Sequence, residues 1–455
     1  MLRWLGPSAA SCAVGLLAFL PASRSPAQPT SSNVLTAWAM PGHDPQRTAQ
    51  ATGVGPQRAT APRLVLKGLT SDPPIIGPDG TLYGFLNYTE RVARVAAVRP
   101  NGQVQWTASA SLPAWWTAEP PDPYPVLASN GNVSFGGGAC PQPAFLAIDR
   151  AQGMGSDGCL TTVGPDGHLQ GHAATRGLTK GGPRLLVQPD GALVRATIGP
   201  YSGFTGSAAA DEARRNVTIY APNGTTRRLG AGCGWANTAL GSDGTLYAVT
   251  LNEPNERQSC PRYSAAQGQN SSSVVAFTPD GSRDWVTPLP LGCAAVALSV
   301  DRGHTYAAAL CTSVGHYTQA RVYVLDTQGH LLWTAHGAGS GYPALALDRA
   351  SGDLWLADTA SLQRFSSTGI LRWRLTWPTT PGDKETLVLD AHGTAYVCGG
   401  DWLLYAISAG GRVVWQHQFT APRSALGHPP GAAISPDGRL YVSSDGVTGM
   451  VVFTP

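Results

Sequence analysis

Short apolar runs alternate with polar turns along most of the chain, and no long segment keeps the 3.6-residue period of a helix. Many turns combine a side chain that accepts backbone hydrogen bonds with a glycine that can take a positive φ. The stretch PDGTLY around Gly80 shows the pattern. Such turns predict hairpins at eight places, centred on Gly80, Gly131, Gly191, Gly244, Gly303, Gly352, Gly393 and Gly438.

A second hairpin signal alternates with the first. It is a glycine followed four residues later by a tryptophan, and it comes directly after an apolar run. The pattern contains Trp106, Trp285, Trp333, Trp373 and Trp415. Two further copies, at Gly167 and Gly224, keep the glycine and lack the tryptophan.

Two hairpins make four strands, and a four-stranded unit that repeats every 40 to 60 residues or so is typical of a propeller blade. Eight copies therefore predict an all-β fold, an eight-bladed β-propeller of four-stranded antiparallel blades. The blade hairpins are expected near residues 73–108, 125–172, 184–229, 238–287, 294–335, 343–375, 385–417 and 432–455. Blade two is ambiguous, because AFLAIDRAQG (144–153) and CLTTVGPDG (159–167) compete for its third strand.

The eighth blade needs a strand from elsewhere in the chain. Residues 449–455 match the third strand of a blade, and no fourth strand follows them. RLVLKGL (63–69) lies just before the first repeat and can supply that strand. We expect it to close the ring and to cover an open sheet edge.

The repeated tryptophans have a structural interpretation in this fold. On an outer strand, a large flat ring can pack against the neighbouring blade, and its burial contributes roughly 3 kcal/mol or more. The glycine before it lets the chain turn sharply. We interpret all five tryptophans as contacts between blades.

The N-terminus has the three regions of a secretory signal peptide, expected at residues 1–27. Arg3 provides the positive charge, Cys12–Leu20 an apolar core, and Ala27 a small residue at the cleavage site. The apolar run is too short for a transmembrane anchor. We therefore expect an exported protein, periplasmic, in the cell envelope or extracellular. Residues 28–62 are expected to be an extended segment before the propeller at 63–455.

Composition excludes some classes of partner. The chain has 455 residues, of which 42% are hydrophobic and 13% charged, which favours a folded protein with a buried core. The net charge is +3, and two of the arginines lie in the expected signal peptide. No basic stripe is present, so we do not expect nucleic-acid binding.

Export would permit disulfide bonds. Cys293 and Cys311 flank the turn around Gly303 symmetrically, so they can face each other across a hairpin. Two other pairs would each close a loop, although sequence alone does not fix the connectivity. These pairs are Cys140 with Cys159 and Cys233 with Cys260. Cys398 is left over and is interpreted as a small buried apolar residue.

Hairpins such as PDGTLY, each followed by a Gly-x-x-x-Trp hairpin, resemble the pyrroloquinoline-quinone-like β-propeller superfamily. TAWAMPGHDPQRTA (36–49) is similar to a stretch that often precedes the first blade in this group. The resemblance covers residues 36–455. It implies one of two functions: a quinone-dependent alcohol or sugar dehydrogenase with calcium, or a non-enzymatic envelope propeller. The latter class includes the lipoprotein subunit of the β-barrel assembly machinery.

The hairpin turns of all blades must share one face, so the connections between hairpins and between blades share the other. Several of these connections are long, and long loops on one face of a rigid scaffold favour a binding function. Trp115, Trp116 and Tyr124 lie in one such Pro-rich loop and are candidate partner-binding residues. The alternative is that they fold back over a blade as a local lid.

Motifs for catalysis are missing from the sequence. It has no His-Glu-x-x-His, Cys-x-x-Cys, P-loop, Rossmann fingerprint or Gly-x-Ser-x-Gly elbow, and no motif that places a metal or a cofactor. We therefore expect a scaffold that binds a protein or a cell-surface component without a cofactor. The alternatives are a quinone-dependent dehydrogenase and a polysaccharide-active hydrolase or lyase, which would need carboxylates converging on the propeller axis.

Overall fold

In the computed structural model, Leu35–Pro455 belong to one compact unit. The described residues are 38–86, 92–111, 125–136, 158–175, 184–196, 217–230, 237–251, 272–313, 316–339, 341, 343–377, 386–398, 402–419, 431–443 and 449–455. The expected signal peptide, residues 1–27, lies outside them.

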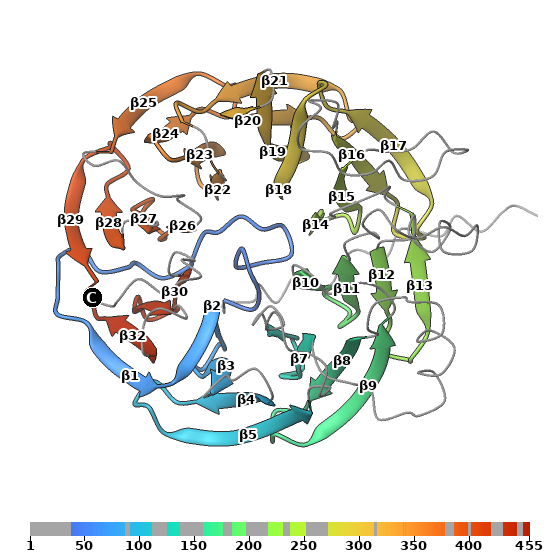
Figure 1. Cartoon of the computed structure of the whole chain (residues 1–455), viewed down its shortest axis with the longest axis vertical. Helices are drawn as coiled ribbons and strands as arrows, with labels where there is room; N and C mark the ends of the chain where they lie inside the picture. Colours follow the sequence, from blue (N-terminus) through green and yellow to red (C-terminus); the bar gives the residue numbers. More distant parts are fainter. Residues whose placement is uncertain are drawn as a thin grey trace, which may run out of the picture. The chain divides into compact units, whose positions relative to one another are not determined.

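The described residues of this compact unit form an eight-bladed β-propeller (Figure 1), as the sequence predicts. Blade 1 contains β2 (Leu69–Ile76), β3 (Leu82–Leu86), β4 (Val92–Val98) and β5 (Val104–Ser111). Blade 2 contains β6 (Val126–Leu127), β7 (Val133–Gly136), β8 (Gly158–Val163) and β9 (Leu169–Thr175). Blade 3 contains β10 (Arg184–Val187), β11 (Leu193–Ala196), β12 (Val217–Tyr220) and β13 (Thr226–Leu229). Blade 4 contains β14 (Asn237–Leu240), β15 (Leu246–Leu251), β16 (Ser272–Phe277) and β17 (Arg283–Pro288).

The other four blades continue around the ring. Blade 5 contains β18 (Cys293–Asp301), β19 (His304–Ser313), β20 (His316–Leu325) and β21 (Leu331–His336). Blade 6 contains β22 (Ala344–Asp348), β23 (Asp353–Ala357), β24 (Ser361–Phe365) and β25 (Leu371–Thr376). Blade 7 contains β26 (Thr386–Leu389), β27 (Ala395–Cys398), β28 (Leu403–Ile407) and β29 (Val413–Gln418). Blade 8 contains β30 (Gly431–Ile434), β31 (Leu440–Ser443), β32 (Gly449–Phe453) and β1 (Arg63–Lys67).

In every blade the strands pair antiparallel, with the first strand innermost and the last strand on the rim (Figure 1). We call the hairpin of the first two strands the inner hairpin and that of the last two the outer hairpin. The glycines that predict the turns all have positive φ, for example +81° at Gly80 and +85° at Gly281. The ambiguity in blade 2 is resolved, because its third strand is β8, which belongs to the CLTTVGPDG segment.

The ring closes as the sequence predicts, by pairing of the first strand with the last. In β1, Arg63 lies opposite Val452 and Lys67 opposite Gly449. The strand ends at Lys67 rather than at residue 69, because Gly68 turns the chain with φ +76° and β2 begins at Leu69. The last blade therefore has no open outer edge on β32.

The tryptophans of the outer strands connect each blade to the next. In five blades the indole N–H donates a hydrogen bond to a backbone carbonyl beyond the blade. The bonds run from Trp106 to Pro165 (2.8 Å), Trp285 to Thr327 (2.9 Å), Trp333 to Ser367 (3.2 Å), Trp373 to Ala409 (2.9 Å) and Trp415 to Pro56 (2.8 Å). Blade 8 ends in β1 and has no outer hairpin like the others, so for Trp415 the N-terminal segment supplies the acceptor.

Arginine takes the place of tryptophan at two further junctions. Arg227 of blade 3 lies opposite Ile219 and donates to the carbonyl of Pro279 at 3.1 Å. Arg63 of blade 8 donates to the carbonyl of Pro100 at 3.1 Å. A β-bulge lies before the tryptophan in the other blades but is missing in blade 3, so the donor there stands three residues after the glycine instead of four. Arg227 therefore does not fit the Gly-x-x-x-Trp pattern.

The first prediction concerns the N-terminal strand. A chain that begins at residue 69 lacks β1, and a chain that begins at residue 58 keeps it. Because β1 is the fourth strand of blade 8, the shorter chain is expected to lose the cooperative thermal transition of the whole ring. Differential scanning calorimetry checks this, with the chain that begins at residue 58 as control, because both chains lack residues 38–57 and differ in β1. A shorter chain that melts like the control would contradict the role of β1 in closing the ring.

The second prediction compares two glycines with the same strained turn. Gly411 has φ +80°, and a Cβ there would lie 2.6 Å from Cδ2 of Trp373. Gly224 has φ +82°, and a Cβ there would meet no atom within 4 Å. Gly224→Ala should cost about 1–2 kcal/mol for the left-handed backbone. Gly411→Ala should cost about 1–3 kcal/mol more, because it also displaces the indole. Urea midpoints measure both, and equal losses would contradict the packing role.

Candidate functional site

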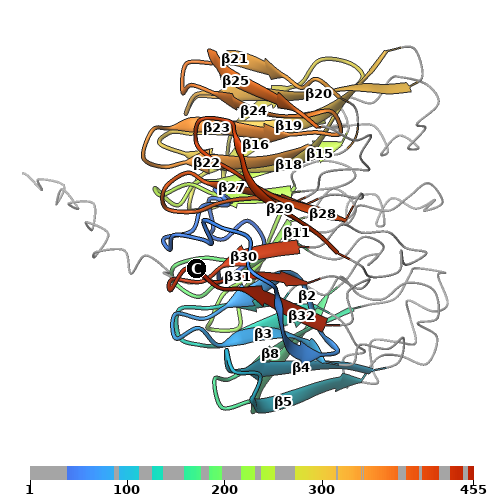
Figure 2. The same ribbon diagram turned by 90° about the vertical axis from the view of Figure 1, so that its left-hand side faces the viewer.

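The blades separate two faces of the ring. The turns of the inner and outer hairpins lie on one face, which we call the turn face, because the strands alternate in direction. The connections between second and third strands, and between blades, leave from the opposite face, which we call the connection face. In Figure 2 the strands run between the two faces, with the turn face on the left.

The candidate partner-binding residues Trp115, Trp116 and Tyr124 lie outside the described residues, in the connection between β5 and β6. The ends of β5, β7, β11 and β15 are described, and all four point to the connection face. The topology therefore gives the longest connections of blades 1 to 4 a common side of the ring.

Asp358 stabilises the connection face where blade 6 follows blade 5. Its Oδ2 accepts the backbone N–H groups of Ala338 (2.7 Å) and Gly339 (3.1 Å) in the connection between these blades. Its Oδ1 accepts those of Ala360 (2.8 Å) and Ser361 (2.7 Å) in the connection from β23 to β24. One buried carboxylate thus fixes two neighbouring connections.

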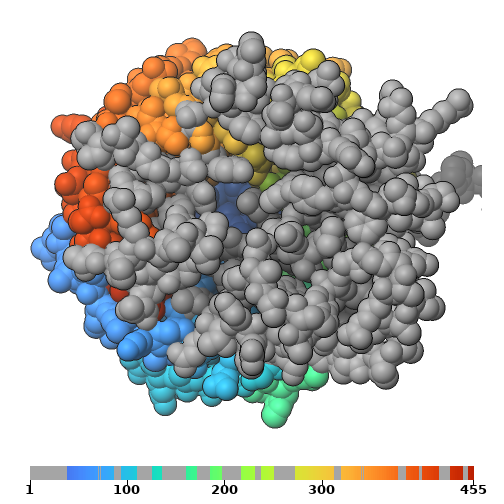
Figure 3. All heavy atoms as spheres, in the orientation of Figure 1, coloured from blue at the N-terminus to red at the C-terminus, as the bar shows by residue number. Residues whose placement is uncertain are grey.

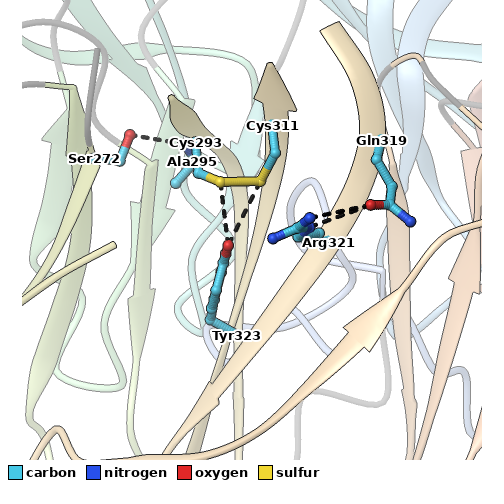
Figure 4. The surroundings of a disulfide bond; sticks show 7 residues. All are labelled: Ser272, Cys293, Ala295, Cys311, Gln319, Arg321 and Tyr323. Atoms are coloured by element: carbon cyan, nitrogen blue, oxygen red, sulfur yellow. Dashed lines mark hydrogen bonds between the residues drawn. A yellow bond between two sulfur atoms is a disulfide. The ribbon is translucent and has the colours of Figure 1, made fainter. Parts of the chain in front are cut away.

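A disulfide joins Cys293 of β18 to Cys311 of β19, the pair that flanks the turn at Gly303 (Figure 4). Both residues are buried, and the hydroxyl of Tyr323 lies 3.1 Å from Sγ of Cys293 and 3.6 Å from Sγ of Cys311. The bond closes a loop of 18 residues in sequence, for which chain entropy gives a stabilisation of about 3 kcal/mol. It fastens the end of blade 5 that faces the connections.

The other two expected cysteine pairs, Cys140 with Cys159 and Cys233 with Cys260, stay predictions. Cys140, Cys233 and Cys260 lie outside the described residues, and for Cys159 only the backbone is described. Cys398 is buried in β27, which agrees with its interpretation as a small buried apolar residue.

Residues 38–55 cross the middle of the ring, and we call them the axial segment (blue in Figures 1 and 3). Six blades donate an inner-strand N–H to its backbone carbonyls. The bonds run from Ile76 to Trp38 (2.9 Å), Leu127 to Ala39 (2.8 Å), Leu240 to Pro45 (2.8 Å), Val300 to Gln46 (2.9 Å), Leu347 to Thr48 (2.8 Å) and Leu389 to Ala49 (2.8 Å). The innermost strands have an open edge toward the axis, and the axial segment pairs with it.

The sequence predicts only an extended segment at 28–62, and the axial segment differs from that expectation. Its backbone has left-handed φ angles at three residues that are not glycine, namely +77° at His43, +57° at Arg47 and +55° at Ala49. Such residues cost free energy and persist where surrounding contacts fix them. No local pattern predicts them, because the contacts come from blades distant in sequence.

Asp44 is the centre of a buried charged network within the axial segment. Its carboxylate accepts hydrogen bonds from the Thr48 backbone N–H (3.0 Å), the Thr48 hydroxyl and Nη2 of Arg349 (2.7 Å), and Nδ1 of His43 lies 3.0 Å away. Burial raises the pKa of Asp44, but His43, Arg349 and Thr48 outweigh it and leave the pKa below 3.8. Asp44 is therefore ionised at neutral pH.

The pKa of Asp301, in the inner turn of blade 5, is shifted in the opposite direction and is raised. Burial raises its pKa, Arg302 and Arg349 lower it, and the negative charge of Asp44 raises it further. Burial, with a contribution from Asp301, also raises the pKa of Tyr306 to about 12. Two carboxylates with opposite shifts thus lie near one arginine, but Asp44 is buried, and its hydrogen-bond partners belong to the chain itself. This arrangement supports a structural role.

Within the part of the chain that the structure describes, no group of three or more His, Cys, Asp or Glu side chains is arranged to hold a metal ion. Over the same part, no helix is long and apolar enough to span a membrane.

No protein-family model matches the sequence, and no curated protein does. Solved structures with a similar fold exist. The crystal structure of BamB from Moraxella catarrhalis aligns with 86% of this chain and 98% of its own, at 13% identity and a TM-score of 0.51. The C-terminal WD40 domain of Sif2 aligns with 89% of this chain and 99% of its own, at 10% identity and a TM-score of 0.55. At these identities the similarity shows the propeller fold alone.

The third prediction concerns Asp44. Asp44→Asn removes the charge that faces Arg349 and should lower the free energy of unfolding at neutral pH by about 2 kcal/mol. Because the folded pKa is lowered, this contribution is present above about pH 4 and is lost as the pH falls through the folded value. Wild type and variant should therefore converge in acid, as measured by urea unfolding across pH.

The matched control is Asp437→Asn, which removes an exposed ion pair with Arg439 (3.2 Å) and should change stability by less than about 1 kcal/mol. A difference between wild type and Asp44→Asn that persists unchanged in acid would contradict the ionised network.

Proposed function

We propose that this protein is an exported propeller scaffold that binds a protein or a cell-surface component through its connection face. The observation that supports it most is the way the ring is fixed around that face. The axial segment pairs with inner strands of six blades, side chains fasten the rim, and Asp358 and the disulfide fix connections. A rigid scaffold that carries long connections on one side is the usual arrangement of a binding surface.

Trp115, Trp116 and Tyr124 are the proposed contacts with the partner. They belong to a connection of blade 1 to blade 2, and clustered aromatic side chains are the residues that most often dominate the energy of a protein interface. The predicted signal peptide at residues 1–27 supports export. BamB supports the proposal only through its shared fold.

The fourth prediction uses a photo-crosslinking residue at one position of each face. Placed at Trp116 on the connection face, it should capture a defined partner in the producing cells. Placed at Gln328, an exposed residue in a turn of blade 5, it should capture none. Trp115→Ala in the Trp116 crosslinking variant should reduce the captured species about tenfold or more. Capture from Gln328 alone, or equally from both faces, would contradict the proposal.

The quinone-dependent dehydrogenase remains the second candidate, carried by the superfamily resemblance. It is separated from the scaffold by titrating the mature protein with pyrroloquinoline quinone, with and without calcium, and following absorbance and Tm. The scaffold proposal expects no calcium-dependent saturation. Saturable binding with oxidation of alcohols or sugars would replace it, and cleavage of a polysaccharide would favour the hydrolase or lyase.

A further inference from the structure

The junction between blades 2 and 3 differs from the other seven. At each of those, a tryptophan or arginine on the outer strand donates an N–H to a backbone carbonyl of the next part of the ring. In blade 2, the register position of the tryptophan is taken by Gly171. Gly171 lies opposite Thr162, just as Trp285 lies opposite Ala276 in blade 4. At this register position the outer strand of blade 2 therefore has no side chain to place at the junction.

The receiving side of the junction keeps the shape that it has elsewhere. The outer turn of blade 3 has Gly224 at φ +82°, and its N–H donates to the carbonyl of Ala221 at 2.9 Å. In the equivalent turn of blade 5, Gly329 has φ +82° and donates to Asp326 at 3.1 Å. The carbonyl two residues before the glycine accepts the indole N–H in blade 5, and in blade 3 that position is Pro222.

Among the described residues, the space at this junction is open. A Cβ on Gly171 or on Gly224 would meet no heavy atom of that part of the chain within 4 Å, apart from the immediate chain neighbours. At junctions that hold an indole, a Cβ on the turn glycine would be in close contact with the ring. A Cβ on Gly329 would lie 2.6 Å from the ring of Trp285, and one on Gly369 would lie 2.8 Å from that of Trp333. Gly171 and Gly224 are both exposed on the rim.

We propose that the rim notch formed by Gly171, Gly224 and the carbonyl of Pro222 is a docking site for a tryptophan side chain of a partner protein. Equivalent surfaces of this same molecule bind an indole five times, with the ring over a turn glycine or beside the closing segment and the N–H on a carbonyl. An indole from another chain meets the same two features. A partner tryptophan buried in such a pocket is typical of an interface hot spot. The notch lies on the rim, so it is independent of the connection-face proposal.

The fifth prediction uses N-acetyl-tryptophan amide as the probe and saturation-transfer NMR on the full chain as the measurement. Wild type should transfer saturation to the indole protons. Gly171→Trp fills the notch with the chain's own indole, so it should reduce the transfer at least about fivefold and raise the Tm. Leu291→Trp is the control, because it adds a tryptophan at a residue that is 72% exposed and leaves the notch open.

Two further probes test the chemistry of the notch on wild type, so the result does not depend on a variant folding. N-acetyl-1-methyltryptophan amide keeps the ring but cannot donate to Pro222, and it should bind about fivefold more weakly. N-acetyl-arginine amide should bind more weakly than the indole probe. Equal binding of all three probes, tighter binding of the arginine probe, or unchanged transfer in Gly171→Trp would overturn the proposal. A dimer of wild type that Gly171→Trp abolishes would also overturn it, in favour of a second copy of this chain as the occupant.

Discussion

The ring depends on one repeated interaction, a side-chain N–H on seven of the eight outer strands that donates to a carbonyl of the next part of the ring. A blade on its own is a small sheet with two open edges, and its stability comes from its neighbours. The indole combines a large apolar face with a donor at its edge, so one side chain both packs against the neighbouring blade and makes a directional hydrogen bond to it. At Arg63 and Arg227 the indole is absent, but a side-chain N–H donor is retained.

The axial segment pairs with the open inner edges of the blades, as the side-chain donors link their outer strands. Inner strands present N–H groups toward the axis, and the segment offers carbonyls to six of them at equivalent positions before each inner turn. The segment needs left-handed residues and a buried Asp44 to follow that path. Rim and axis together hold these six blades from two sides, which leaves the connections on the connection face free to vary in length without loss of the ring.

Sequence reasoning identified the repeat, the blade count and the closing strand, because turn chemistry and strand period are local signals. It missed the axial segment, whose conformation is set by strands that are distant in sequence, and it missed Arg227, which stands in the tryptophan position because one bulge is absent. Asp44 and Arg349 are 305 positions apart, and no spacing rule brings them together. Trp115, Trp116 and Tyr124 stay predictions, since they lie outside the described residues.

The closing blade also sets the timing of folding. Its outer strand comes from the start of the ring and its other three strands from the end, with Arg63 opposite Val452. Forming a contact between such distant positions first loses loop-closure entropy, and the contact stabilises the fold only once it is made. Blades 1 to 7 can pair their own strands as they emerge, but β1 has no partner until β32 is synthesised. We therefore expect a nascent chain to remain an open arc until residues 449–453 are available to pair with β1.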